Sequence, residues 1–223
     1  NDLRKTAVIT NYDEAERIGI QHSAAITCVK PSGTVSQLTG VSSGMHPWHN
    51  DYYIRTVRGD KKDPLTQFLM EAGVPAEDDF MNPTQTKVFS FPVKAPEGAI
   101  LRNDLTAIEH LNTWLVYQRA WCEHKPSITV SVRDEEWMEV GAWVWEHFDE
   151  VSGISFLPYS DHTYKQAPYQ DATKEEYEEA LSKMPEKIYW EMLTMYETED
   201  GTSGSQTLAC SSDAGCEVVD IGS

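Results

Sequence analysis

The sequence has little positive charge. It contains 18 Lys and Arg residues against 36 Asp and Glu residues, for a formal net charge of -18. Sequence-independent binding of nucleic acid requires clustered Lys and Arg, so this composition argues against a nucleic-acid partner. An anionic small molecule would have to be held by local groups, against the field of the whole chain.

Long apolar runs are also absent. No window approaches the eighteen consecutive apolar residues that a membrane span needs, and the first thirty residues lack a basic segment followed by an apolar one. The sequence therefore predicts neither a membrane helix nor a signal peptide. We expect a soluble, cytoplasmic protein.

Cysteines and metal-binding motifs are few. The histidines show no H-E-x-x-H or comparable spacing, so no metal is predicted. Cys28 and Cys122 are isolated and are expected in the core. Cys210 and Cys216 lie close together near the end, without the two further ligands that zinc would need. They are either a reversible dithiol on a flexible arm or two incidental thiols.

The length and the apolar content suffice for a sizeable core. The 223 residues are 40% hydrophobic and include seven Trp. We expect a globular body over residues 1–170 and an acidic helical segment over 171–200, whose charges form a solvated outer face. Residues 201–223 are rich in Gly and Ser and are expected to form a mobile tail.

Strand and helix patterns alternate, which predicts an α/β fold. The predicted strands are 23–29, 51–59, 86–93, which stops near Pro92, 127–132 and 153–160. Helical patterns cover 12–23, 63–73, 103–124 and 134–150, and two further helices are expected on either side of Pro185. The strand, helix, strand succession over 127–160 predicts a parallel pair with a right-handed crossover.

The stretch "CVKPSGTVSQL" begins at Cys28 and combines a turn with a row of hydroxyls. A strand-to-helix turn of this kind presents N–H groups at the positive end of a helix, where phosphate is held, and Gly33 would allow close approach to the backbone. The G-x-x-x-x-G-K-[ST] pattern of a nucleotide P-loop is missing. From these residues alone, an anion cradle and an ordinary helix cap without a ligand both remain open.

Several longer strings resemble one family. They are "CVKPSGTVSQL", "SGMHP", "YYIRTVRGDKKDPLTQFL", "VFSFPVKAPEGA", "WCEHKPSITVS", "SGISFLPYSDHTYKQAPYQ" and "GSQTLAC" followed by a second Cys. Together they closely resemble the C-terminal portion of the adenosylcobalamin-dependent (class II) ribonucleotide reductases, of the monomeric type that acts on ribonucleoside triphosphates. The resemblance covers nearly the whole chain and is weakest over 171–200.

This resemblance implies a fold and a chemistry. The fold would be the C-terminal part of a ten-stranded α/β barrel. The loop that binds the substrate's phosphates would consist of Pro31, Ser32, Gly33, Thr34, Val35 and Ser36. Cys210 and Cys216 would re-reduce the active-site disulfide and be reduced by thioredoxin. The enzyme would convert ribonucleoside triphosphates to 2′-deoxyribonucleoside triphosphates through a thiyl radical that adenosylcobalamin initiates.

The thiyl cysteine of the family has no match here. No N-P-C-G-E-like string occurs, "MNPTQ" has no Cys, and the chain begins at Asn1. We therefore expect a fragment or one half of a split enzyme, inactive alone, whose partner is the missing N-terminal portion with the thiyl cysteine. The alternative is a stand-alone phosphate-ligand binding or thiol-redox module without radical chemistry.

Overall fold

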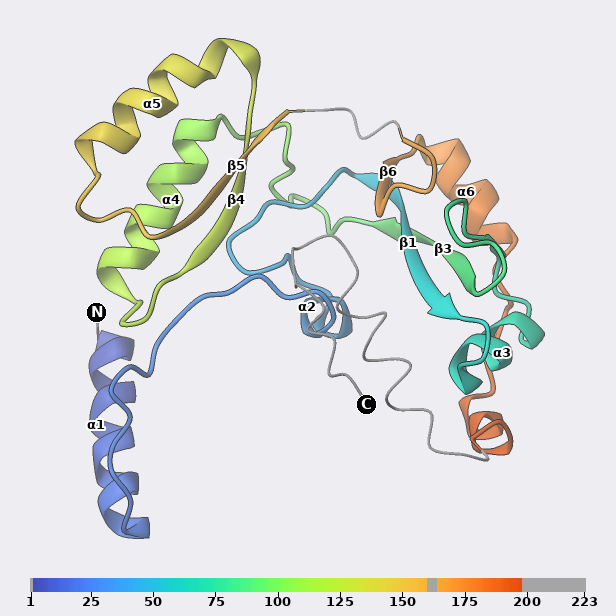
Figure 1. The fold of residues 1–223 in the computed structure, drawn as a ribbon, viewed down its shortest axis with the longest axis horizontal. Helices are drawn as coiled ribbons and strands as arrows, with labels where there is room; N and C mark the ends of the chain where they lie inside the picture. The colour runs from blue at the N-terminus through green and yellow to red at the C-terminus, as the bar shows by residue number, and fades with distance from the viewer. Residues whose placement is uncertain (1, 160–163, 198–223) are drawn as a thin grey trace, which may run out of the picture. The chain divides into compact units, whose positions relative to one another are not determined.

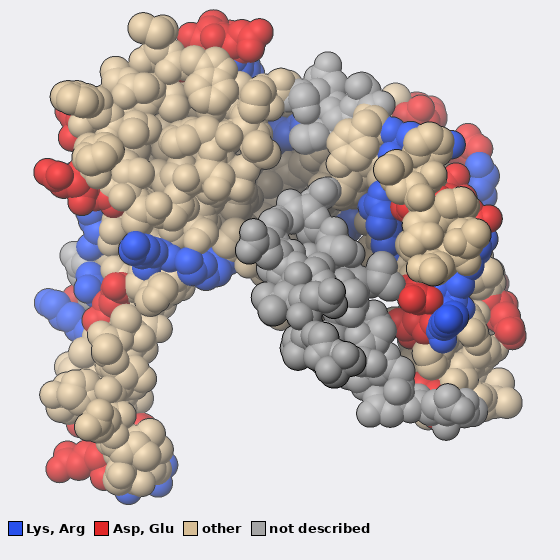
Figure 2. Space-filling model, in the orientation of Figure 1, with Lys and Arg blue, Asp and Glu red and all other residues tan. Residues whose placement is uncertain are grey.

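The computed structural model describes residues 2–159 and 164–197. The chain divides into two compact units, one from residues 1–50 and 96–161 and the other from 51–95 and 162–223. Figure 1 shows the helices and strands of both units. On the face drawn in Figure 2, each unit carries basic as well as acidic side chains. The boundaries predicted at 170 and 200 stay predictions.

The first unit is built on a parallel strand pair, as the sequence predicted. β4 (Ser127–Val132) and β5 (Gly153–Pro158) pair in parallel. The connection contains a 3-10 turn, η1 (Asp134–Glu136), and α5 (Trp137–Glu146), so the helix predicted over 134–150 is shorter than expected.

α4 (Ala107–Ala120) packs against β4 and α5. It starts after a capping box, in which Thr106 and Glu109 satisfy each other's backbone N–H groups. The pattern over 103–124 thus predicted the helix but placed its ends too far apart.

The core of the first unit lies between the strand pair and the two helices. β4 turns alternate residues toward α4 and α5, and the side chains on that face are almost fully buried: Ile128, Val130 and Val132. Trp114 and Trp143 meet edge to face among them, with ring centroids 6.5 Å apart. Burying an aliphatic or aromatic side chain of this size contributes about 1.5–3 kcal/mol, so this layer fixes the position of β4.

The opposite face of the strand pair is open within the described residues. Ser131, Ser155 and Leu157 point away from α4 and α5 and are exposed. Both faces of a parallel sheet are normally covered by other elements. No described element of this unit covers that face, and the mixed α/β character of the described residues agrees with the predicted class.

The strand predicted over 23–29 is wrong. The oxygen of Thr27 accepts from the amide of Glu123 at 2.9 Å, and the oxygen of Val29 accepts from that of Ser127 at 3.3 Å. Residues 26–30 thus run beside the chain that enters β4, in the same direction, but these bonds are too sparse for a regular ladder.

Two helices flank this extended segment. α1 (Asp2–Ile18) precedes it and is longer than the predicted helix, whereas α2 (Val35–Thr39) follows it and has only five residues. The helix that was expected after the row of hydroxyls is therefore little more than one turn long.

The second unit contains a four-stranded antiparallel sheet in the order β2-β3-β1-β6. Its strands are β1 (Tyr52–Asp60), β2 (Ala76–Asp78), β3 (Thr86–Lys94) and β6 (Tyr169–Asp171). The two long strands confirm the predicted ones, but β3 continues through Pro92 instead of ending there.

Three helical segments accompany this sheet. α3 (Pro64–Glu71) lies within the helix predicted over 63–73 and is capped by Asp63, and α6 (Lys174–Ser182) packs on β3 and β1. The 3-10 helix η2 (Trp190–Met195) lies against α3, where Trp190 contacts Phe68. Across residues 2–159 and 164–197, the helices are all too short or too polar to span a membrane.

Candidate functional site

The turn from Pro31 to Ser36 leads from the extended segment into α2. Inside it, the hydroxyl of Ser32 accepts from the amide of Ser36 at 3.0 Å, and the hydroxyl of Ser36 donates to the oxygen of Ser32 at 2.9 Å. Ser36 is 3% exposed, while Pro31, Gly33, Thr34 and Val35 lie on the surface. The two serines therefore fix the turn from within, and its outer backbone faces solvent.

The start of α2 offers backbone donors. The first intrahelical bonds run from the amides of Gln37 and Leu38 to the oxygen of Thr34, at 3.0 and 3.1 Å. The amides of Thr34 and Val35 precede those bonds, in the region where a helix leaves its N–H groups without intrahelical partners. A Cβ on Gly33 would meet no described atom within 4 Å, so residues 2–159 and 164–197 leave space beside Gly33.

The loop after α2 holds the turn in place. The amide of Ser32 donates to the hydroxyl of Ser43 at 2.8 Å. Gly44 has φ 60°, and a Cβ on it would lie 2.8 Å from the oxygen of Lys30. Residues 43 and 44 thus contact the backbone directly where the turn begins.

His46 connects this loop to β4. Its Nε2 accepts from the amide of Thr129 at 3.0 Å, and its Nδ1 lies 2.9 Å from the oxygen of Ser43. Because a backbone amide only donates, Nε2 carries no proton and Nδ1 donates to Ser43. Burial lowers the pKa of His46, although the bond to Ser43 opposes that shift, so the neutral ring is favoured.

A second buried histidine supports the same loop. His110 of α4 lies with its ring centroid 5.5 Å from that of His46, and its Nε2 is 3.2 Å from the oxygen of Met45. Burial, and secondarily the neighbouring His46, lower the pKa of His110 to about 4. Both rings are therefore neutral at pH 7, and they serve here as hydrogen-bonding groups.

Two arginines lie near the carboxyl ends of the parallel strands. Arg133 directly follows β4, Tyr159 directly follows β5, and the guanidinium carbons of Arg133 and Arg102 each lie 5.2 Å from the Tyr159 ring centroid. Glu136 pairs with Arg133 at 3.4 Å. The segment that leads into the turn at Pro31 runs beside the start of β4, where the amide of Ser127 donates to the oxygen of Val29. Ligands of open α/β sheets bind outside the carboxyl ends of strands, where the two arginines lie.

Sequence reasoning missed Arg102, Arg133 and both buried histidines. The string "SGMHP" did mark the neighbourhood of His46 through the family resemblance, but no periodicity or spacing linked it to Thr129, 83 positions away. Arg102 and Tyr159 are likewise brought together only by the fold.

The predicted thiol pair, Cys210 and Cys216, lies outside the described residues, so its role stays a prediction. The other two cysteines are free: Cys28 is partly buried and Cys122 is 6% exposed. Burial is the main cause that raises the pKa of the Cys122 thiol, which makes it a poor nucleophile and agrees with a core role.

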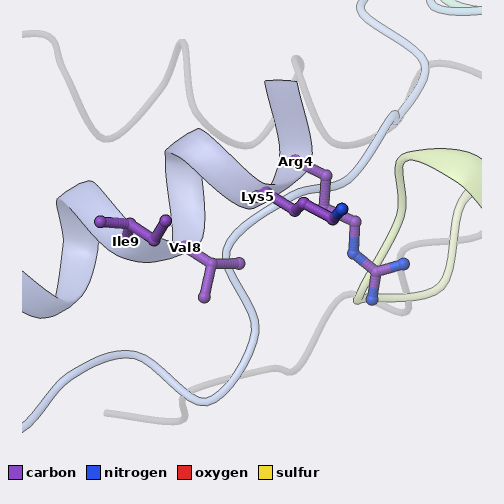
Figure 3. Close-up of a pocket in the computed structure, with 4 residues that line it drawn as sticks. All are labelled: Arg4, Lys5, Val8 and Ile9. Atoms are coloured by element: carbon purple, nitrogen blue, oxygen red, sulfur yellow. The ribbon is translucent and has the colours of Figure 1, made fainter. Parts of the chain in front are cut away.

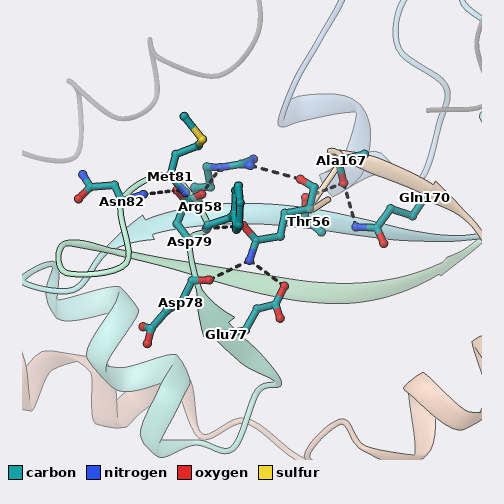
Figure 4. Close-up of polar contacts among 11 residues, drawn as sticks. Thr56, Arg58, Glu77, Asp78, Asp79, Met81, Asn82, Ala167 and Gln170 are labelled. Atoms are coloured by element: carbon teal, nitrogen blue, oxygen red, sulfur yellow. Dashed lines mark hydrogen bonds and ion pairs between the residues drawn. The ribbon is translucent and has the colours of Figure 1, made fainter. Parts of the chain in front are cut away.

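Two other features lie apart from the turn. A hollow on the first unit is lined by Arg4, Lys5, Val8 and Ile9 of α1, shown in Figure 3, and contains none of the predicted site residues. In the second unit, the buried Gln166 sits at the centre of a polar network with Glu77, Asp78 and Phe80 (Figure 4). Its bonds are internal to the protein, so the network is structural.

No family model matches the chain. Among curated proteins, the adenosylcobalamin-dependent ribonucleoside-triphosphate reductase of Euglena gracilis is 35% identical over 185 residues, which are 81% of this chain and 25% of that protein. The enzyme of the same name from Lactobacillus leichmannii is 33% identical over 183 residues, 80% of this chain and 24% of that protein. The chain belongs to the adenosylcobalamin-dependent ribonucleotide reductase family.

The fold agrees with this membership. A crystal structure of a B12-dependent (class II) ribonucleotide reductase superposes with a TM-score of 0.74 at 28% identity, over 89% of this chain and 28% of that one. The chain thus spans about a quarter of the length of the reductases that it matches.

Neither buried histidine has a ring nitrogen available for cobalt. Both ring nitrogens of His46 are bonded within the protein, and His110 is 6% exposed with its Nε2 at a carbonyl. In residues 2–159 and 164–197, no group of three or more His, Cys, Asp or Glu side chains is arranged to hold a metal ion. We therefore assign no residue to adenosylcobalamin.

Proposed function

We propose that the chain is the C-terminal portion of a reductase that converts ribonucleoside triphosphates to 2′-deoxyribonucleoside triphosphates. The similarity to reductases of this name over four fifths of the chain carries the proposal. Adenosylcobalamin, when bound to the whole enzyme, would supply the radical that starts the reaction. In the same enzyme, the first unit would contribute strands to a ten-stranded α/β barrel.

Exposed apolar side chains support a partner for this chain. Leu3 and Ile9 of α1 are 76% and 61% exposed, and Met138 and Trp145 of α5 are 86% and 84% exposed. Apolar groups on two helices, together with the open face of a two-stranded parallel sheet, are typical of surfaces that another part of a protein covers. We assign this role to the N-terminal portion of the reductase with the thiyl cysteine.

The turn from Pro31 to Ser36 is proposed to bind the substrate's phosphates. The amides of Thr34 and Val35, which precede the first intrahelical bonds of α2, would be suitable donors for phosphate oxygens. Arg102 and Arg133 place positive charge near the carboxyl ends of β4 and β5, in a chain whose net charge is -18. These groups would supply local attraction for an anionic substrate in an acidic protein, with part of the charge of Arg133 offset by Glu136.

Cys210 and Cys216 are proposed to carry reducing equivalents. Substrate reduction would leave a disulfide in the active site, and exchange with the tail dithiol would restore it and leave the tail oxidised. Thioredoxin would then reduce the tail pair. This role rests on the family resemblance of the terminal "GSQTLAC" string.

A chimera tests the proposed function. This chain would replace the matching segment of the Lactobacillus leichmannii enzyme, to which it is 33% identical. With adenosylcobalamin and a dithiol, the chimera should form deoxyribonucleotide from ATP, whereas the same enzyme lacking the segment should not. A chimera that folds and binds ATP but reduces none would contradict the proposal.

The stand-alone alternative makes a different prediction. The chain by itself would then be monomeric, and it would show no interaction with the remaining portion of a reductase. Analytical ultracentrifugation of the chain mixed with that portion of the Lactobacillus leichmannii enzyme separates the two hypotheses, since our proposal predicts a complex.

A further inference from the structure

A continuous series of hydrogen bonds runs from β4 to the phosphate turn. The amide of Thr129 donates to Nε2 of His46 at 3.0 Å, and Nδ1 of His46 donates to the oxygen of Ser43 at 2.9 Å. The hydroxyl of Ser43 accepts from the amide of Ser32 at 2.8 Å, and the hydroxyl of Ser32 accepts from the amide of Ser36 at 3.0 Å. Each link fixes the next, and β4 is anchored in the core.

His46 takes the place of a missing strand neighbour. In a strand, the amides of residues i and i+2 point to the same side, so Thr129 faces the same way as Ser127, whose amide donates to the oxygen of Val29. The chain turns away from β4 at Pro31, so a backbone acceptor no longer continues beside Thr129. The imidazole supplies that acceptor and, through Ser43, holds the departing turn.

We infer that His46 is a positioning residue that fixes the phosphate-binding turn at Pro31–Ser36 relative to β4, in a manner that requires its neutral Nδ1–H form. The inference rests on the proposed role of the turn in binding substrate phosphates. The hydrogen bonds from His46 reach the turn through Ser43, so it would act on the ligand indirectly.

Protonation would undo this arrangement. A protonated ring has donors at both nitrogens, so Nε2 would present an N–H to the amide of Thr129 and the bond between them would be lost. The groups known to face His46 are the amide of Thr129 from β4, the oxygen of Ser43 from the loop and the imidazole of His110 from α4. His110 is the titratable group among these, and it is neutral above about pH 4.

Amide hydrogen exchange on the full chain tests the positioning directly. In His46→Ala, the amides of Ser32 and Thr129 should exchange about tenfold faster than in the wild type, since each bond in the series is worth roughly one such factor. His147→Gln is the matched control, because His147 also bonds a carbonyl through Nδ1 in the first unit but is not part of this series. Unchanged exchange at both amides in His46→Ala overturns the inference, whether or not a ligand binds.

Ligand binding tests the consequence for the site. Titration of ATP into the chain at pH 7.5 should give an affinity about tenfold weaker for His46→Ala and unchanged for His147→Gln. In His46→Gln, the amide oxygen can replace Nε2 as acceptor, so most of the affinity should return. As the pH is lowered below 6.5, the wild type should lose affinity once His46 is protonated, whereas His46→Gln should not, because Gln does not titrate.

Gly33→Val and His46→Ala together distinguish a wrong phosphate site from a wrong role for His46. If Gly33→Val abolishes ATP binding but His46→Ala and the wild type bind alike at each pH, the turn is the phosphate site and His46 does not position it. If ATP binding survives Gly33→Val while amide exchange at Ser32 still responds to His46→Ala, then His46 does position the turn, but the turn is not the phosphate site.

Discussion

Gly44 lies so close to the backbone of Lys30 that a Cβ at position 44 would be 2.8 Å from the Lys30 oxygen. Real Cβ atoms essentially never approach an oxygen so closely, and the obstacle is backbone that cannot rotate away. Gly44 also has φ 60°, which L side chains adopt only at a cost. The contact therefore brings the loop after α2 against the residue that precedes the turn, and it leaves no room for a side chain at position 44.

Gly44→Ala should consequently destabilise the first unit by about 2–3 kcal/mol, the sum of backbone strain and a forced shift. Gly40→Ala is the matched control. Gly40 has φ 65°, but a Cβ there would meet nothing within 4 Å, so about 1 kcal/mol of strain is expected. Urea unfolding of both variants measures the difference. Equal losses would show that the close approach to Lys30 has no energetic effect.

The pKa of His110 predicts a dependence of stability on pH. The folded-state pKa is about 4, below the ordinary value of 6.5, so the unfolded chain binds more protons between these limits. The contribution of His110 to stability is complete above pH 6.5 and is lost as the pH falls toward 4, in total about 3 kcal/mol. His110→Gln should flatten this part of the profile of unfolding free energy.

Elements with local signals were predictable from the sequence. Asp63 before Pro64 indicates a helix cap, and the apolar run of 127–132 indicates a buried strand. The helix α3 and the strand β4 are found where they were expected. The segment 23–29 has the composition of a strand. A strand also needs a partner, however, and here the partner would be the chain that enters β4. Residues between Glu123 and Ser127 form too few regular backbone hydrogen bonds with the segment to make a β-ladder.

The candidate site was predictable only in part. The turn at Ser32, Gly33 and Ser36 was found because hydroxyls and Gly cluster locally, and the family resemblance then selected the phosphate hypothesis. His46 and Thr129 are far apart in sequence, and no local pattern reveals that a side chain will replace a backbone acceptor. The division into two units also stayed hidden, because each unit is assembled from two separate stretches of chain.

The side chain of Gln166 holds together the polar network in the second unit (Figure 4). It is 6% exposed, its Nε2 donates to Glu77 and to the oxygen of Asp78 at 2.8 Å each, and its Oε1 accepts from the amide of Phe80 at 2.7 Å. Gln166→Ala leaves buried groups without partners and should cost about 2–3 kcal/mol. Gln170→Ala removes one bond, to the oxygen of Ala167, and should cost under about 1 kcal/mol. Similar losses in urea unfolding would contradict this ranking.

Loss of the proposed tail dithiol should affect sustained turnover but not a single turnover. In the chimera with the Lactobacillus leichmannii enzyme, Cys210→Ser should abolish sustained reduction of ATP with thioredoxin, because the active-site disulfide then has no internal reductant. A single turnover of pre-reduced enzyme needs no such exchange and should be unchanged, and the same pattern is expected for Cys216→Ser. Cys28→Ser, at a thiol in the first unit whose Sγ donates to the oxygen of Lys125 at 3.3 Å, should preserve both activities. If Cys210→Ser reduced single and multiple turnovers equally, the tail thiols would be acting on the chemistry or the fold, and their role as shuttle would have to be abandoned.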